Sequence, residues 1–452
     1  MLRRKSALWT ALFTVPLLLP SYLTYTGWGM LRAPGSVLGS WLAHGSPDRA
    51  VILNAVLAIG GLALWAWPIG AFIISPWFRQ IPTDLLDLLD LEPVGLWRKC
   101  LTIGRVALPG VAASIGVIAV IMAGSAIPLH LAQVQTYAIH LWLYLSLTSD
   151  PASVWPAATP LLGLALAAAV LISLRLARGE TDLHQDGDAD RPARSRLPIL
   201  LAAAVWAASV LAPLVLMATH LRHAQSIAEF WRLSGPAVVG SGLVAVLVGA
   251  TCALLGVCTF GAATCIRGTA RRGVLWTATT LAIGAAFVPG ILVGQAVLTL
   301  INGPWAPFGL GTTDVPLIIA HVARFGFVGV IAGWLLVRTE SAEERGARLL
   351  ASGDTVRGWA MLRLYPNLAV LVGVGLAAGA LSLHEIESTV MLARPGSANI
   401  AQYMLDRLHY ARDEELCAAC VNMIGIGIVL SSGAAMLLSR GYRRSVPGLR
   451  TP

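Results

Sequence analysis

The chain has 452 residues, of which 56% are hydrophobic and only 12% are charged. Its mean hydropathy of +0.73 excludes an ordinary soluble domain and indicates a polytopic membrane protein. The formal net charge is +9, and the basic residues, nearly all arginines, stand in short groups between apolar runs. This pattern follows the tendency of basic residues to gather on the cytoplasmic side, so nucleic-acid binding is not expected.

Apolar runs that can cross a bilayer, which takes about 20 residues, recur along the whole sequence. They predict an all-α polytopic membrane helix bundle with about ten transmembrane helices. The first run is too long for the apolar core of a signal peptide, so we expect it to remain as a span. With the arginine-rich segments placed inside, both termini are cytoplasmic. The expected spans are 7–29, 51–75, 106–127, 158–177, 197–219, 236–262, 274–301, 314–338, 366–386 and 417–438.

A long polar segment at 178–196 separates two parts of the chain, and we expect it to be a flexible cytoplasmic linker. A charged loop at 76–109 in the first part corresponds to a charged loop at 339–366 in the second, which indicates an internal repeat. Only two spans precede the first loop, so the two halves are expected to be related but unequal. The expected units are a first half at 1–177, the linker, a second half at 197–440 and a cytoplasmic tail at 441–452.

The loop at 339–366 carries the most specific pattern in the chain, because Gly353 and Pro366 stand at a defined separation just before an apolar run. This loop resembles the signature loop with which permeases of ABC importers dock onto their ATPase subunit. The family pattern is Glu-Ala-Ala, three residues, Gly, nine residues and then Ile-x-Leu-Pro. Here Ala347-Arg348-Leu349 replaces the triplet and Arg363 takes the Ile position.

The residues beyond this loop, from Ser382 to Tyr410, look like the ferric-iron and thiamine branch of the same family. In the ferric-iron branch, two permease halves occur fused in one polypeptide. The resemblance implies a type I ABC-importer permease fold in a bacterial inner membrane, with an ATPase subunit and an external solute-binding protein as partners and membrane lipid around it. It favours ferric iron or a thiamine-like molecule as the solute.

The resemblance also implies which residues contact the ATPase. In the first half, Val106-Ala107-Leu108-Pro109 fits the end of the pattern, but Gly95 lies one residue too far from Pro109, so this copy is degraded. The residues expected in the two coupling loops are Glu343, Glu344, Gly353, Asp354, Arg357, Pro366, Gly95 and Pro109.

No ATP site of its own is expected in this chain. A phosphate-binding loop of the Walker type needs a glycine-rich turn that ends in Lys-Ser or Lys-Thr, and neither Lys5 nor Lys99 has such a context. Cys417 and Cys420 have the spacing of a metal or redox pair but begin an apolar helix, where cysteine behaves as a small hydrophobe. We therefore expect no cofactor, no bound metal and no catalytic residue.

Polar residues inside the apolar runs are candidates for the translocation path. His321 and Arg324 share one face of a helix, since they are three residues apart, and a charge at that depth normally faces a cavity or a partner. They could contact an anionic solute, but pairing of Arg324 with Glu385 or Glu387 is the interpretation we favour. Further candidates for the path are Gln295 and Asn302.

The polar loop that begins at His384 allows two interpretations. His384, Glu385 and Glu387 offer ligands that could guide a metal ion such as ferric iron, whereas a solvated loop between two spans is the simpler alternative and the one we favour.

Two other functional classes stay open. A membrane enzyme is disfavoured because the sequence has neither a His-Glu-x-x-His nor a Gly-x-Ser-x-Gly motif. A non-transporting membrane scaffold or sensor is indicated by the altered triplet and the short first half.

Overall fold

The computed structural model describes residues 15–444 apart from several gaps, and every regular element in the described part is a helix. The all-α class is therefore confirmed. Two segments expected from the sequence, the linker at 178–196 and the tail at 441–452, fall largely outside the described residues. The gaps are 33–35, 45–46, 80, 82, 92–94, 149–150, 179–196, 222, 224, 266–267, 305–308, 340–345, 347–355, 395 and 411.

Seven helices in the described part are long and apolar enough to cross a membrane, so the chain is a multi-pass membrane protein. One of them continues through a π-helical turn and consists of α10 (Leu197–Trp206), η3 (Ala207–Leu211) and α11 (Ala212–Thr219). The other six are α4 (Pro47–Arg79), α6 (Leu96–Gly124), α9 (Val154–Arg178), α12 (Gln225–Cys265), α15 (Val315–Thr339) and α21 (Asp413–Arg444).

The expected span 274–301 is not one straight helix. It consists of α13 (Thr269–Phe287) and α14 (Gly290–Ile301), which meet at an angle of 116° and count together as an eighth candidate span. The bend lies at Pro289, which cannot donate a backbone hydrogen bond and pushes the preceding residue out of the helical region. Val288 accordingly has an extended backbone, with ψ at 132°.

Two further expected spans are not among the candidates, so the described residues contain seven or eight candidate spans, and the expected ten are not confirmed. At 366–386 the helix α18 (Leu368–Leu383) has 16 residues. At 7–29 the helix α2 (Ser21–Gly29) begins after a break at Pro20, and residues 1–14 lie outside the described part.

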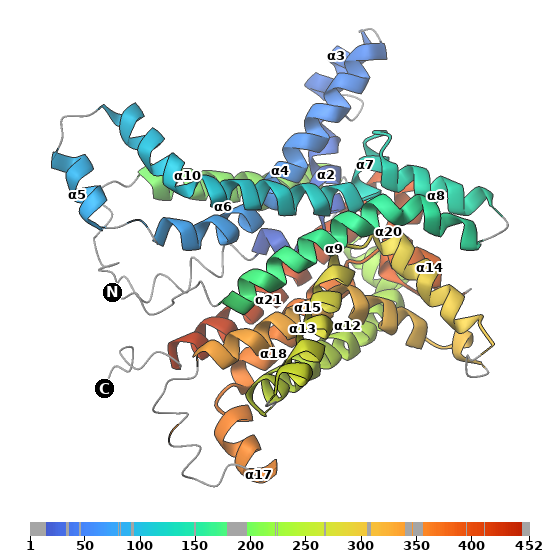
Figure 1. Cartoon of the computed structure of the whole chain (residues 1–452). Coiled ribbons are helices and arrows are strands. Elements are labelled where there is room, and N and C mark those ends of the chain that lie inside the picture. The colour runs from blue at the N-terminus through green and yellow to red at the C-terminus, as the bar shows by residue number, and fades with distance from the viewer. Residues whose placement is uncertain are drawn as a thin grey trace.

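Short helices connect the spans. α8 and α20 begin where the side chains of Thr136 and Asn399 accept a backbone N–H of the first turn, which is how such residues start helices. In Figure 1, α7, α8, α14 and α20 lie together on the right, while α5 and α17 project at the left and the bottom. The short elements are η1 (Met30–Arg32), α3 (Val37–Ala43), α5 (Thr83–Leu91), α7 (Ile127–Leu131), α8 (Tyr137–Leu147), η2 (Pro151–Ser153), η4 (Leu310–Thr312), α17 (Val356–Trp359), η5 (Ala360–Leu364), α19 (Glu387–Leu392) and α20 (Ile400–His409).

The tightest packing in the bundle joins α12 to α15 and α18. Glycines allow these backbones to approach closely. A Cβ atom added at Gly329 would lie 1.9 Å from the carbonyl oxygen of Cys252, and one at Gly249 would lie 2.4 Å from the carbonyl oxygen of Gly375. Small residues at such contacts are typical of helices that pack inside a membrane.

Helix order and contacts recur between the N-terminal group, α2 to α9, and the C-terminal group, α10 to α21. Each group contains the same succession of four α-helices: an apolar helix, two short helices and a long helix. The four are α6, α7, α8 and α9 in the N-terminal group, and α18, α19, α20 and α21 in the C-terminal group. α2 and α14 each begin directly after a proline with an extended backbone, Pro20 and Pro289. α2 packs on α4 and α7, and α14 packs on α15 and α19. The broken ends therefore gather where the two groups meet.

Candidate functional site

A buried ion cluster lies at this meeting point. The guanidinium of Arg324, on α15, donates to Oε1 of Glu385 at 2.8 Å and to Oε2 of Glu387 at 3.2 Å. The side chain of Arg324 is 18% exposed and those of both glutamates are 9% exposed. The expected pairing of Arg324 is thus confirmed, and it involves both carboxylates. Because a charge at this depth is costly without a partner, the three side chains form one unit.

Glu387 also caps the first residues of two separate helices. Its Oε1 accepts the backbone N–H of Ala126, directly before α7, at 2.8 Å, and its Oε2 accepts the N–H of Gly290, the first residue of α14, at 2.8 Å. The first N–H groups of a helix have no partner within the helix, and the helix dipole favours a negative charge beside them. One carboxylate therefore joins α19 to both groups of helices.

Glu385 and Gly290 complete the cluster. Oε1 of Glu385 accepts the backbone N–H of Ser388 at 3.1 Å in addition to Arg324. A Cβ atom at Gly290 would lie 2.0 Å from a guanidinium nitrogen of Arg324 and 2.6 Å from Oε1 of Glu385. Only glycine leaves room for the ions at this position. Sequence reasoning missed both Ala126 and Gly290, although the Pro289-Gly290 step inside an apolar run indicates a helix break.

His321 lies on the same helix as Arg324 but has its own partners. Its Nδ1 is 2.8 Å from the hydroxyl of Ser382 and its Nε2 is 3.1 Å from the hydroxyl of Thr389. The ring is 2% exposed. His321 therefore links α15 to α18 and α19 through hydroxyl groups. His321 and Arg324 make separate polar contacts, which lie next to one another on α15.

The interpretation of the His384 loop as solvated is wrong. His384, Glu385 and Glu387 are only 6%, 8% and 9% exposed. Irregular backbone at membrane depth is tolerated where protein surrounds it, and here the protein supplies a partner for each carboxylate. The described residues also contain no group of three or more His, Cys, Asp or Glu side chains placed to hold a metal ion.

The other two path candidates do not join the ion cluster. Gln295, on α14, is buried, and its amide nitrogen donates to the hydroxyl of Thr299 one turn later at 3.4 Å. Asn302 is the C-cap of α14 and is exposed. Neither makes a hydrogen bond to Arg324, Glu385 or Glu387 among the contacts of the described residues.

The coupling residues are only partly described. Glu343, Glu344, Gly353 and Asp354 lie outside the described residues. Arg357, on α17, and Pro366, in the turn before α18, are exposed.

The first coupling loop differs from its expected form. Gly95 is the exposed N-cap of α6, but Pro109 lies inside this helix, which runs without a break from Leu96 to Gly124. The expected loop end at Pro109 is therefore wrong. Pro109 lies near the middle of α6, where a proline removes one backbone hydrogen bond, and the packing of α6 on α4 and α9 holds both sides of the helix in place.

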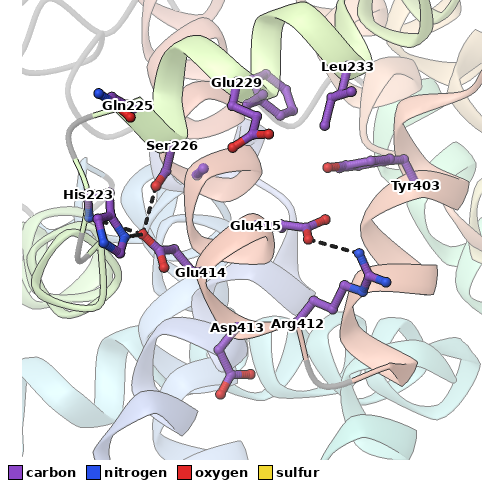
Figure 2. A pocket seen from close by; sticks show the side chains of 12 residues that line it. His223, Gln225, Ser226, Glu229, Leu233, Tyr403, Arg412, Asp413, Glu414 and Glu415 are labelled. Carbon is purple, nitrogen blue, oxygen red and sulfur yellow. Dashed lines mark hydrogen bonds and ion pairs between the residues drawn. The ribbon is translucent and has the colours of Figure 1, made fainter.

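An open pocket of about 460 Å³ lies where α12 and α21 begin. Figure 2 shows Glu229, Glu414, Glu415 and Asp413 around it, with Tyr403 across from Glu229. Glu414 accepts the hydroxyl of Ser226 at 2.7 Å and the backbone N–H of His223 at 3.0 Å, which ties the start of α12 to α21. Arg412 donates to Glu415 at 3.0 Å. Acidic side chains and the basic side chains that pair with them therefore line this pocket together.

Two histidines lie near one another at the same end of the bundle. The ring of His130, on α7, is 6.5 Å from that of His409, on α20, and 5.5 Å from the ring of Trp142, measured between centroids. Burial lowers the pKa of His130, and the neighbouring His409 lowers it further. The neutral form of His130 is thus favoured at neutral pH, which suits its edge contact with Trp142.

The polar groups of the ion cluster bind one another and hold helix ends. No family model, curated protein or solved structure matches the chain.

Proposed function

We propose that the chain is the membrane-spanning subunit of an ABC importer, which couples ATP hydrolysis by a separate subunit to alternating access. The observation that carries this proposal is the repeated helix order of the two groups, whose broken helices meet between them. Many transporters are built from two such repeats, and their solute path lies between the repeats beside discontinuous helices. In this proposal the halves are 1–177 and 197–440, joined by the linker 178–196.

The projecting elements support an ATPase contact. α5 belongs to the loop 76–109 and α17 to the loop 339–366, and both project away from α7, α8, α14 and α20 (Figure 1). Leu88 and Leu91 on α5, and Met361 and Tyr365 after α17, are exposed. Exposed apolar side chains on projecting segments are typical of surfaces that bind another protein. Gly353 and Pro366 would shape the contact of the second half, and the charged residues that face the ATPase would be Glu343, Glu344, Asp354 and Arg357.

The proposed solute is a cation, with ferric iron or a thiamine-like molecule favoured. The resemblance of the C-terminal residues supports this choice. At the pocket where α12 and α21 begin, Asp413 is exposed, while Glu229 pairs with Arg232 and Glu415 pairs with Arg407 and Arg412. An external solute-binding protein would deliver the solute at this end, in a bacterial inner membrane with both termini in the cytoplasm.

A membrane scaffold or sensor without transport is the second candidate. It is favoured by the position of Pro109 inside a continuous helix, since the first coupling loop then lacks the form of the second.

The first experiment is affinity purification of the chain in mild detergent, followed by identification of the proteins that co-purify. The importer proposal predicts a stoichiometric ATPase subunit, and predicts that Gly353→Trp or deletion of 343–357 abolishes its retention. Gly425→Trp is the matched control, because a Cβ atom at Gly425 meets nothing within 4 Å. If no ATPase co-purifies under conditions that preserve a known permease complex, the scaffold is the better assignment.

A further inference from the structure

We propose that Glu387 is a latch between the two groups of helices, which opens when its bond to Ala126 breaks. The Ala126 N–H belongs to the N-terminal group, while Glu387, Arg324 and Gly290 belong to the C-terminal group. The contact joins residues 261 positions apart in the sequence. A movement that separates the two groups at this point must therefore break a hydrogen bond to a buried carboxylate.

An apolar seal lies directly beside this latch. Ile127 follows Ala126 and Ile386 precedes Glu387, and both isoleucines belong to one buried cluster together with Tyr22 and Met404. The same four side chains line a small apolar cavity. Each group thus contributes, at its own helix break, one isoleucine to the seal. The hydrogen bond holds the two breaks together, and the apolar contacts exclude water from between them.

The energetics suit a switch better than a permanent joint. The carboxylate of Glu387 keeps Arg324 and the Gly290 N–H when the Ala126 bond breaks, so it does not become an unpaired buried charge. A local opening therefore costs one hydrogen bond to a charged group and the apolar contacts of the seal, while the packing of α9 on α13 and of α2 on α11 still joins the two groups. The loss of a hydrogen bond of this kind changes an equilibrium roughly ten- to a hundredfold, which is within the range of typical coupling between conformational states.

Ala126→Pro removes the N–H of the latch bond, and it also places a ring where Ala126 is fully buried, so its effect is compared with that of Glu387→Gln. The φ angle of Ala126 is −92°, near the range of proline, and Ser125 before it is already extended, as a residue before proline prefers. Ala126→Gly is the control, because it alters the side chain at the same position and keeps the N–H. Glu387→Gln keeps one oxygen acceptor but removes the negative charge that Ala126, Gly290 and Arg324 share, so it weakens the latch from the other side. Glu229→Gln removes a charge at an exposed ion pair with Arg232 and is its control.

The experiment measures how fast a membrane-impermeant maleimide labels a cysteine at position 404, in a chain whose native cysteines are replaced. Met404 is 1% exposed, so Met404→Cys is protected while the seal is closed. We expect Ala126→Pro and Glu387→Gln to raise the labelling rate roughly ten- to a hundredfold, the factor that corresponds to the loss of one hydrogen bond to a charged group. We expect Ala126→Gly and Glu229→Gln to leave it unchanged.

Three outcomes overturn the latch: unchanged labelling in Ala126→Pro and Glu387→Gln, equal acceleration in Ala126→Gly, or acceleration that appears only near the unfolding temperature of each variant. The role of the latch in transport rests on the proposed function, but labelling is measured on the chain alone. An ATPase that fails to co-purify contradicts the importer proposal and leaves the labelling result intact.

Discussion

At the scale of single residues, the ion cluster shows how a buried charge is kept by partners from several elements. Arg324 faces two carboxylates, and one of these carboxylates also accepts two backbone N–H groups. Removing one member leaves the others without compensation, so the cost of a substitution exceeds the net contribution of the intact pair.

Arg324→Leu therefore has a large predicted effect. It leaves Glu385 and Glu387 buried without their cation, and we expect a loss of about 3–5 kcal/mol in the free energy of unfolding. The exposed pair of Arg232 and Glu229 is the control, because Arg232→Leu should cost less than about 1 kcal/mol. Thermal unfolding in detergent measures both. Equal stability of the two variants would contradict the assignment of Arg324 to a buried cluster.

Gly290→Ala tests the room that the cluster needs. The added methyl group would collide with Arg324 and Glu385, and forced overpacking costs about 1–3 kcal/mol. Gly116→Ala is the control, since a Cβ atom there meets nothing within 4 Å. If Gly290→Ala unfolds at the same temperature as Gly116→Ala, the result contradicts the close approach of Arg324 and Glu385 to Gly290.

At the scale of elements, proline and glycine decide where helices break and how closely they pack. The break at Pro289 turns α13 into α14 and places an N-terminal helix end beside Glu387. In contrast, Pro109 does not interrupt α6. The difference arises from the residue before each proline, because Val288 is extended whereas residue 108 remains helical.

The packing of α12 on α15 predicts the effect of Gly329→Ala. The methyl group would meet the backbone of Cys252, which cannot move as a side chain can, so the two helices must separate along their contact. We expect a loss of at least about 2 kcal/mol by comparison with other overpacked sites. Gly242→Ala on α12, which faces open space, should be neutral. Chemical denaturation of the two variants distinguishes the outcomes, and a neutral Gly329→Ala would refute the close approach.

At the scale of the whole molecule, the two groups of helices meet at their broken ends and carry their projecting elements on the other side (Figure 1). This arrangement makes the orientation in the membrane testable with two positions. Cys100, near the start of α6, and Ser146, on α8, are both exposed.

Labelling from one side of the membrane should separate these two positions. In single-cysteine chains, an impermeant maleimide added to intact cells should label Ser146→Cys but not Cys100, and it should reach Cys100 after permeabilisation. This follows from the cytoplasmic placement of the arginine-rich segments. Labelling of Cys100 in intact cells would invert the proposed topology.

The sequence by itself determined that this is an all-helical, multi-pass membrane protein, because long apolar runs can bury their backbone polar groups in lipid only as helices. It also predicted that Arg324 pairs with a glutamate, since a charge inside such a run needs a partner. These conclusions depend on local composition, which can be read along the chain.

Only the tertiary structure decided that the loop of Glu385 and Glu387 is buried. Its polar residues look solvated when they are read alone, and their partners lie on other elements: Arg324 is 61 positions from Glu385, and Ala126 is 261 positions from Glu387. Whether a polar loop faces water or protein depends on which distant helices pack around it. The fold as a whole sets that packing, and it brings the first residues of two helices to the carboxylate of Glu387.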